Sequence, residues 1–239
     1  MAQKLIEYTH NGATLEGYMA WDEGRVGPLP GVLVSHAWAG RGEFECEKAR
    51  MLAERGYCAF ALDLYGKGVL GSGIEENSRL MKPFVDDRAL LQARLCAGLE
   101  TFADQPEVDA DRIAAIGFYF GGLCVLDLAR IGADVRGVVS LHGLFAAPGN
   151  TAGRKITAKV LALHGHDDPM VPVEMVNALE QELTEAGADW QIHVYGNTMH
   201  AFTNPAANDP GHGTVYNLVA ARRAWVVTQD CLSEVLASR

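Results

Sequence analysis

The sequence predicts a single-domain α/β protein with a mostly parallel central sheet and helices on both faces. Strand-like and helix-like segments alternate along nearly all of its 239 residues, as they do in parallel sheets joined by crossover helices. Apolar residues make up 49% of the chain, enough to build a sizeable core. No repeat, low-complexity tract or linker divides the sequence. We therefore expect one domain over residues 1–239.

The N-terminal half is expected to open with a β-hairpin. Residues 4–20 contain two mixed runs separated by His10-Asn11-Gly12, a turn sequence that favours a hairpin. The elements expected next are, in order, a buried strand at 30–35, a helix at 43–55 that stops at Gly56, a buried strand at 58–64, a glycine-rich loop at 66–73 and a helical stretch at 76–103 interrupted near Pro83.

The C-terminal half continues the alternation. Its expected elements are, in order, a strand at 112–117, a helix from Gly121, strands at 135–141 and 159–164, a helix at 173–186, a strand at 190–195 and a final helix at 215–236. Residues 203–213 are polar and rich in glycine and proline, which predicts a surface loop.

Charge and composition exclude several classes of partner. The formal net charge is −10, whereas nucleic-acid binding needs clustered Lys and Arg, so we expect no nucleic-acid partner. No apolar stretch approaches the roughly 20 residues of a membrane span, and the N-terminus has no apolar signal segment. The five cysteines are widely spaced and suggest neither a disulfide framework nor a zinc site. These features favour a cytoplasmic protein, a monomer or weak homo-oligomer.

A glycine-flanked turn carries the sharpest chemical signal. The segment Gly117-Phe118-Tyr119-Phe120-Gly121-Gly122 follows an expected strand and precedes an expected helix, which is the context of a nucleophile elbow. The glycines suit a strained turn in which neighbouring side chains would clash. Taken alone, the segment fits an ordinary strand-to-helix turn equally well.

Two later strand ends supply an acid and a histidine. Asp168 follows the strand at 159–164, and His200 follows the strand at 190–195. The order Tyr119, Asp168, His200 matches the nucleophile, acid, histidine order of α/β-hydrolases. All three residues lie at the carboxyl ends of parallel strands, where such sheets bind ligands.

The sequence blocks around these residues resemble those of the dienelactone hydrolase family. GFYFGG, HGHDDPMVP and GNTMHAF are similar to that family's nucleophile, acid and histidine blocks, and SHAWAGRGEF and ALDLYGKG are similar to its two early strand-end blocks. The resemblance covers nearly the whole chain. It implies a lidless α/β-hydrolase fold and hydrolysis of a small-molecule lactone or ester by a Cys-His-Asp triad, without a metal or other cofactor.

The resemblance also assigns the rest of the site. It implies that the backbone amides of Trp38 and Phe120 form the oxyanion hole and that Ala37 and Asn204 line the substrate pocket. His36 is either a pocket residue or a hydrogen-bonded histidine at a strand end, and we expect it to line the pocket because its loop borders the oxyanion hole. No arginine follows His200 as in the best-known family members, which disfavours an anionic dienelactone. Cys124 lies more than a turn into the following helix and is expected in the core.

Two residues depart from the family pattern. Tyr119 stands where the family has its nucleophilic cysteine, and Ala37 stands where it commonly has a glutamate. A phenol titrates near pH 10, so it is a weaker acyl-transfer nucleophile than a thiolate, and its oxygen lies further from the backbone. We expect slow ester hydrolysis that Tyr119→Cys accelerates and that Tyr119→Cys with Ala37→Glu accelerates further.

Several interpretations stay open. The nucleophile is Tyr119 or a water activated by His200; alternatively, the chain is a non-catalytic relative that binds a small molecule, or the tyrosine replaces a native cysteine. The string from His164 to Asp168 has two histidines on one strand face, yet it lacks further ligands, so no metal site is expected. His142 also ends a strand, and we expect a structural role for it.

Overall fold

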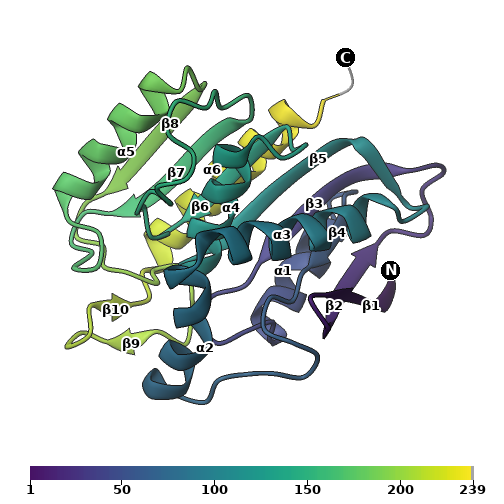
Figure 1. Ribbon diagram of the computed structural model, residues 1–239, viewed down its shortest axis with the longest axis horizontal. Coiled ribbons are helices and arrows are strands. Elements are labelled where there is room, and N and C mark those ends of the chain that lie inside the picture. Colours follow the sequence, from purple (N-terminus) through teal and green to yellow (C-terminus); the bar gives the residue numbers. More distant parts are fainter. Residues whose placement is uncertain (238–239) are drawn as a thin grey trace.

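An eight-stranded sheet forms the centre of the computed structural model, which describes residues 1–237 (Figure 1). The strand order is β1-β2-β4-β3-β5-β6-β7-β8. The strands are β1 (Ala2–His10), β2 (Ala13–Trp21), β3 (Leu29–Ser35), β4 (Cys58–Ala61), β5 (Val108–Phe118), β6 (Gly137–Leu141), β7 (Lys159–Gly165) and β8 (Trp190–Tyr195). Only the pairs β1–β2 and β2–β4 are antiparallel, so the mostly parallel sheet is confirmed.

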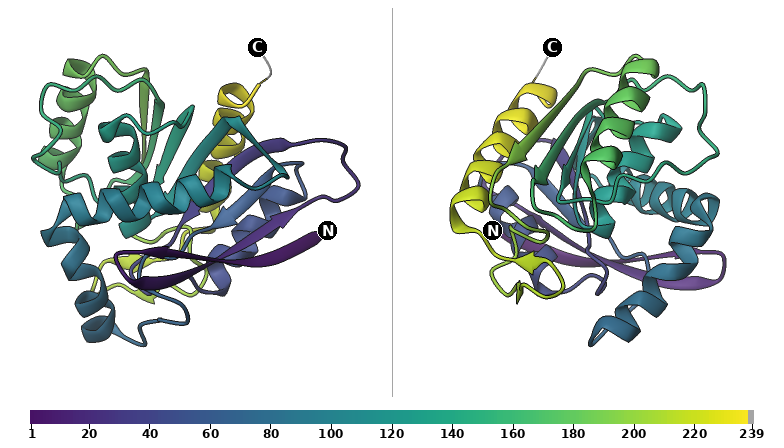
Figure 2. Two further views of the ribbon diagram at one scale, coloured as in Figure 1. Left: turned by 45° about the vertical axis from the view of Figure 1, so that its right-hand side comes forward. Right: turned by 90° about the vertical axis from the view of Figure 1, so that its left-hand side faces the viewer.

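Within residues 1–237, six helices cover both faces of the sheet. They are α1 (Glu43–Ala53), α2 (Ile74–Asp86), α3 (Arg88–Ala103), α4 (Phe120–Ile131), α5 (Val173–Glu185) and α6 (Leu218–Val235). Helices α1 and α6 pack into one apolar core, while α3, α4 and α5 pack into a second core on the opposite face. The right-hand view of Figure 2 shows α6 and α5 on opposite sides of the sheet. No separate lid domain occurs within residues 1–237, as expected.

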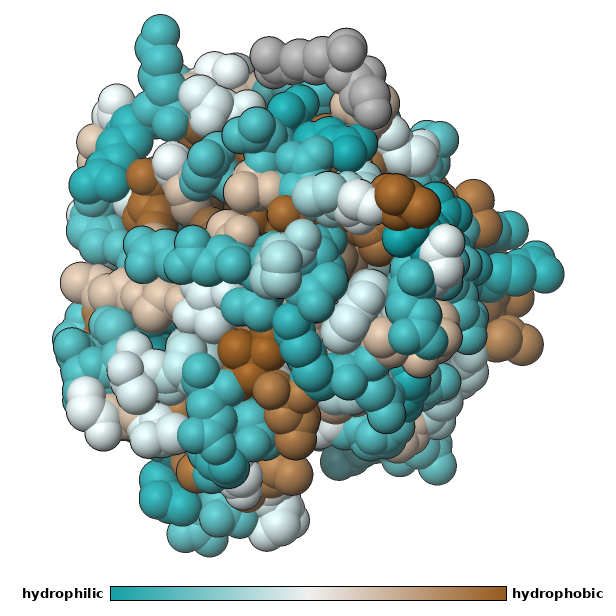
Figure 3. Space-filling model, turned by 90° about the vertical axis from the view of Figure 1, so that its right-hand side faces the viewer, coloured by the Kyte–Doolittle hydropathy of each residue, from teal (hydrophilic) through white to brown (hydrophobic). Residues whose placement is uncertain are grey.

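The central strands are buried on both faces, and their apolar composition matches this burial. β3, β4 and β6 consist almost entirely of buried apolar or small residues, as strands covered by helices on both faces require. The edge strand β1 instead alternates exposed and partly buried residues. Figure 3 views the side on which β1 and β2 lie, and hydrophobic residues there occur in small separate groups among hydrophilic ones.

Several element ends differ from the expectation by a few residues: α1 ends at Ala53, β4 ends at Ala61, β5 begins at Val108 and β6 begins at Gly137. Two further differences concern how the helices are divided. The helical stretch at 76–103 is interrupted at Asp87, which caps α3 by accepting a hydrogen bond from the Leu90 amide, rather than at Pro83, which lies inside α2. The final helix begins at Leu218, because Val215 belongs to a small hairpin of β9 (Asn208–Asp209) and β10 (Thr214–Val215). The hairpin lies within and just after the expected surface loop. No helix among the described residues is long and apolar enough to cross a membrane.

Candidate active site

A cavity of about 310 Å³ opens at the carboxyl ends of the parallel strands. Its walls come from the loops that follow β3, β5, β6, β7 and β8, from the start of α1 and from the glycine-rich loop before α2. The lining residues are Ala37, Trp38, Ala39, Gly40, Gly42, Glu43, Phe44, Glu45, Leu70, Gly71, Phe118, Tyr119, His142, Met170, His200, Ala201, Asn204 and Thr214. The cavity therefore collects most of the predicted site residues.

Tyr119 occupies the turn between β5 and α4 in a strained backbone conformation. Its φ is 53° and its ψ is −109°, values that a non-glycine residue rarely adopts. The flanking glycines allow this turn. A Cβ on Gly121 would lie 2.2 Å from the carbonyl oxygen of Ser35, and a Cβ on Gly117 would lie 2.0 Å from the carbonyl oxygen of Gly121. This geometry is that of a nucleophile elbow, as expected.

The ring of Tyr119 packs between two aromatic neighbours. It meets the ring of Trp38 edge-on, with 5.5 Å between centroids, and the imidazole of His200 edge-on, with 4.7 Å between centroids. Burial, followed by the nearby charge of Asp168, raises the pKa of the Tyr119 phenol above its usual value near 10. The phenol is therefore protonated at neutral pH, so the ring acts mainly as an aromatic wall.

His200 and Asp168 form a buried pair. Nδ1 of His200 lies 2.6 Å from Oδ2 of Asp168, within hydrogen-bond distance. Oδ1 of Asp168 accepts the amide proton of Met170 at 2.8 Å, so both carboxylate oxygens have a partner. Nε2 of His200 is buried and has no hydrogen-bond partner in residues 1–237. Because Nδ1 is engaged by Asp168, Nε2 is the nitrogen available for proton transfer.

Neighbouring strands bring this pair together. β7 and β8 are adjacent and parallel, and the amide of Asp167 donates to the carbonyl of Thr198 at 2.9 Å, which joins the acid loop to the histidine loop. The backbone of His200 in turn bonds Gly213 and Val215, so the β9–β10 hairpin fixes the histidine loop. The acid and histidine blocks, which follow one another along the chain, are therefore also in contact in the fold.

Two backbone segments border position 119, the start of α4 and the loop after β3. Phe120 is the first residue of α4, so its N–H has no carbonyl partner inside the helix. Trp38 belongs to the loop after β3, and its carbonyl accepts a hydrogen bond of 3.0 Å from the hydroxyl of Tyr65. Its ring stacks on His212 of the β9–β10 hairpin, with 6.2 Å between centroids. Both amides therefore sit in segments that neighbours hold in place.

Glu45 fixes the loop that carries Trp38, and the sequence reasoning missed it. Its Oε1 accepts the amide proton of Ala37 at 3.3 Å, and its Oε2 accepts that of Gly42 at 2.9 Å. Glu45 lies in the first turn of α1, where its side chain binds the backbone amide of the N-cap residue Gly42, and the residue is only 3% exposed. The available signal was a glutamate three residues after the expected N-cap of α1.

Two histidines differ from their expected roles. His36 was expected to line the pocket, but its ring is fully buried outside the cavity lining, and its Nε2 accepts the Leu64 amide proton at 3.2 Å. His142 was expected to be structural, yet it lines the cavity with its ring centroid 5.2 Å from that of His200. Burial, and then the proximity of His200, lowers the pKa of His142 well below its usual value, so its ring is neutral at neutral pH.

The remaining predicted residues follow the expectation in part. Ala37 and Asn204 line the cavity, and Cys124 is fully buried in the core. No group of three or more histidines, cysteines or carboxylates within residues 1–237 is arranged to hold a metal ion. His166 is exposed whereas His164 is buried, so the two rings lie in different environments.

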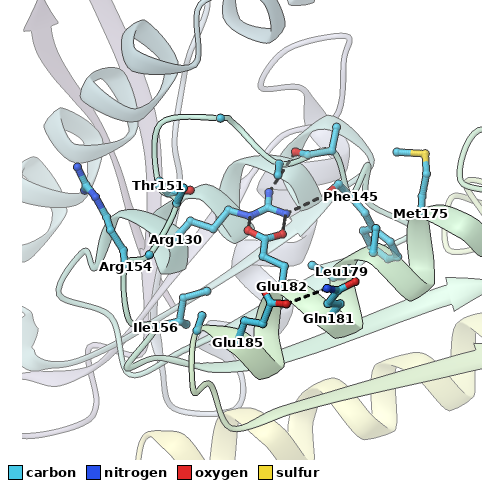
Figure 4. A pocket seen from close by; sticks show the side chains of 17 residues that line it. Arg130, Phe145, Thr151, Arg154, Ile156, Met175, Leu179, Gln181, Glu182 and Glu185 are labelled. Atoms are coloured by element: carbon cyan, nitrogen blue, oxygen red, sulfur yellow. Dashed lines mark hydrogen bonds and ion pairs between the residues drawn. The ribbon is translucent and has the colours of Figure 1, made fainter.

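A larger cavity of about 450 Å³ lies away from the strand ends, between α5 and the loop that joins β6 to β7 (Figure 4). Its floor is the buried ion pair of Arg130 and Glu182, with nitrogen–oxygen distances of 2.8 and 2.7 Å. Arg130 also donates to the carbonyls of Phe145 and Ala146. The guanidinium group of Arg130 therefore holds this loop in place. None of the triad candidates lines this cavity.

Comparisons with known proteins show which family the chain is similar to. The model of the dienelactone hydrolase family matches residues 15–236. A solved structure named m3DLH is 39% identical with a TM-score of 0.93, and a dienelactone hydrolase-like promiscuous phosphotriesterase, P91, from metagenomic libraries is 37% identical with a TM-score of 0.93; each comparison covers 99% of both chains. A putative carboxymethylenebutenolidase of Yersinia pestis is 29% identical over 80% of this chain and 75% of its own.

Proposed function

The chain belongs to the dienelactone hydrolase family and is a hydrolase of lactones or esters, and from this premise we propose that position 119, Asp168 and His200 form its catalytic triad. The single observation that carries the proposal is the arrangement of His200. One ring nitrogen is held by Asp168 at 2.6 Å, and the other is unpaired beside position 119. A histidine oriented in this way is a general base.

The tyrosine determines which nucleophile His200 serves. The phenol of Tyr119 has a raised pKa, so it yields little phenolate at neutral pH, and its oxygen lies beyond the reach of a cysteine sulfur. We therefore assign the nucleophile of this chain to water. His200 takes a proton from the water as its oxygen attacks the carbonyl carbon. The oxyanion accepts hydrogen bonds from the amides of Trp38 and Phe120. The tetrahedral intermediate then expels the alcohol oxygen, which takes the proton from His200.

We expect Tyr119→Cys to raise kcat/KM for p-nitrophenyl acetate by on the order of 10²-fold or more, because a thiol of suitable reach joins an existing base and oxyanion hole. Initial rates are compared for the parent, Tyr119→Cys and Tyr119→Phe. His200→Ala in both the parent and the cysteine variant distinguishes triad chemistry from the reactivity of surface groups.

The outcomes separate the alternatives. Parent and Tyr119→Phe should be similarly slow if water is the nucleophile, whereas loss of activity in Tyr119→Phe would make the phenol the nucleophile. A folded Tyr119→Cys that is no faster than the parent would contradict the triad. It would favour the second candidate, a non-catalytic protein that binds a small molecule in the same cavity.

An uncharged phosphotriester is a second candidate substrate. The relative P91 is described as a promiscuous phosphotriesterase, and the cavity of this chain has no lysine or arginine among its lining residues. A neutral triester needs no such side chain, unlike a phosphate monoester. Release of p-nitrophenol from diethyl p-nitrophenyl phosphate by the same variants tests this candidate, and its absence from all of them would exclude it.

A further inference from the structure

Glu45 places a buried negative charge in the wall of the cavity. The residue is 3% exposed, and its two carboxylate oxygens accept only backbone amide protons, those of Ala37 and Gly42. It forms no ion pair within residues 1–237. The two arginines nearest to it along the chain are engaged elsewhere, Arg41 with Glu16 and Arg50 with Glu43. Its charge is therefore stabilised mainly by dipoles, and the cation that it interacts with, Lys48 on the same helix, forms no ion pair with it.

The rest of the cavity wall adds no positive charge. No lysine or arginine is among the lining residues, and the other acidic residue, Glu43, is at the rim with its side chain 78% exposed. Lys48 attracts Glu45 electrostatically, but its Nζ lies over the Phe44 ring, 4.9 Å from the centroid, and it does not line the cavity. A bound ligand thus meets no lysine or arginine on the cavity wall.

Aromatic rings form much of the same wall. Trp38, Phe44 and Tyr119 all line the cavity and are all half-buried. Aromatic faces attract organic cations, and quaternary ammonium groups are commonly recognised by aromatic side chains together with a carboxylate. A carboxylate ligand, in contrast, would be desolvated beside Glu45 without a partner.

We propose that Glu45 is the specificity-determining residue of this site and that it selects esters carrying a quaternary ammonium group over neutral esters, and neutral esters over carboxylate esters. The expected order of hydrolysis rates rests on the proposed function. The expected order of binding affinities does not depend on it. Charges interact more strongly in a partly buried site than in water, so a preference on the order of 10-fold per charge step is expected.

Three acetate esters of matched shape test the proposal. They are 3-acetoxy-N,N,N-trimethylanilinium, its uncharged isostere 3-tert-butylphenyl acetate, and 3-acetoxybenzoate. Each kcat/KM is divided by the hydroxide-catalysed rate constant of the same ester, which removes differences between leaving groups. We expect the parent to prefer the cationic ester to the anionic ester by about 10²-fold, and to retain most of this ratio at 0.5 M NaCl because Glu45 is buried.

Variants of α1 assign the preference to one residue. Glu45→Gln removes the charge and keeps the shape, so the cation-to-anion ratio should fall by about 10-fold or more, whereas Glu45→Asp should retain it. Glu47 is exposed on the same helix and lies outside the cavity lining, so Glu47→Gln should change the ratio by less than about 2-fold. If Glu45→Gln fails to fold, the cation-to-anion ratio of the parent protein still tests the proposal. A parent that does not show the expected order of esters overturns it.

Failure of the two proposals is distinguishable. If the parent hydrolyses none of the esters, the proposed function fails, and binding is measured with the phenols alone by isothermal titration calorimetry. These are 3-hydroxy-N,N,N-trimethylanilinium, 3-tert-butylphenol and 3-hydroxybenzoate. The same order in Kd, flattened by Glu45→Gln, would support the inference about charge. Equal Kd values, or tightest binding of the benzoate, would overturn it.

Discussion

Position 119 shows how far one side chain changes a site whose backbone is intact. The ring of Tyr119 fills the space beside His200, while the turn that holds it keeps the φ of 53° that an elbow requires. The neighbouring amides belong to the backbone, so the substitution does not remove them. What the substitution changes is the acidity and the reach of the side chain at position 119.

The surroundings of Ala37 change the result expected for the Ala37→Glu variant. The sequence pattern suggested that Ala37→Glu would improve a Tyr119→Cys variant, but Glu45 already binds the amide of Ala37 at 3.3 Å. A second carboxylate there would be placed near the first, and like charges in a buried site repel. We now expect Tyr119→Cys with Ala37→Glu to be no faster than Tyr119→Cys, and to unfold at a lower temperature. Initial rates and Tm of the two variants check this. A faster double variant would mean that the two carboxylates do not interact.

Sequence reasoning located the residues that follow strands, because chain order and strand ends determine where they meet. Tyr119, Asp168 and His200 were identified in this way. His36 was misplaced because its ring direction depends on the Leu64 amide, which is distant in the chain. Glu45 was missed because its role is set by a bent loop that brings Ala37 and Gly42 to the same carboxylate. Side-chain direction after a strand is a property of packing that no local pattern encodes.

At the scale of elements, the junction of β5 and α4 depends on close backbone contact. A Cβ at Gly121 would meet the carbonyl oxygen of Ser35 at 2.2 Å, and neither backbone can move freely. We expect Gly121→Ala to lower the free energy of unfolding by about 1–3 kcal/mol and to reduce activity, since it displaces the elbow. Gly196→Ala is the matched control, because a Cβ there meets nothing within 4 Å. Urea unfolding measures both, and equal stability of the two variants would contradict the close contact.

A buried charge network joins α3, α4 and α5. Asp127 is fully buried and accepts hydrogen bonds from Arg88 at 2.9 and 2.5 Å and from Arg130 at 3.3 Å. We expect Asp127→Asn to destabilise the protein by about 3–5 kcal/mol, because it leaves buried arginine charge uncompensated. Asp86 forms an exposed ion pair with Lys82 on α2, so Asp86→Asn should cost less than about 1 kcal/mol. Thermal unfolding of the two variants compares the contributions of the two ion pairs to stability. Similar Tm values would show that the buried pair contributes no more than the exposed one.

Most elements were predictable because their signals are local. The His10-Asn11-Gly12 turn and the glycine stop after α1 lie where the sequence placed them, and every expected strand is present, although β4, β5 and β6 have shifted ends. The break between α2 and α3 was misplaced because Pro83 fits inside α2, while Asp87 supplies the cap that starts α3. The β9–β10 hairpin has strands of two residues, which are too short to show a period.

At the scale of the whole molecule, buried histidines predict sensitivity to acid. Burial lowers the pKa of His36, His142 and His164, so these rings stay neutral in the folded protein. The unfolded chain binds protons near the ordinary histidine pKa of about 6.5. Their contribution to stability is therefore complete above this pH and is lost as the pH falls below it, by up to about 1.4 kcal/mol per pH unit for each ring.

Two histidines in neighbouring positions test this dependence. The free energy of unfolding is measured in urea at pH 7.5, 6.5 and 5.5, a range above the ordinary pKa of carboxyl groups. His164→Gln should reduce the loss between pH 6.5 and 5.5 by up to about 1.4 kcal/mol. His166→Gln, which changes an exposed ring two positions along, should leave the parent's loss unchanged. Identical pH profiles for both variants would exclude a role for the buried ring.

The side chain at position 119 can be replaced in protein engineering while the turn that carries it keeps its conformation. The glycines at 117 and 121 and the first turn of α4 shape the turn, while the residue at 119 projects into the cavity and is only half-buried. Its replacement therefore changes the reactive group without repacking the core. Cysteine, serine or an unnatural nucleophile introduced there would face the same histidine and the same two amides. The scaffold thus allows alternative nucleophiles to be compared within one pocket, with geometry held constant.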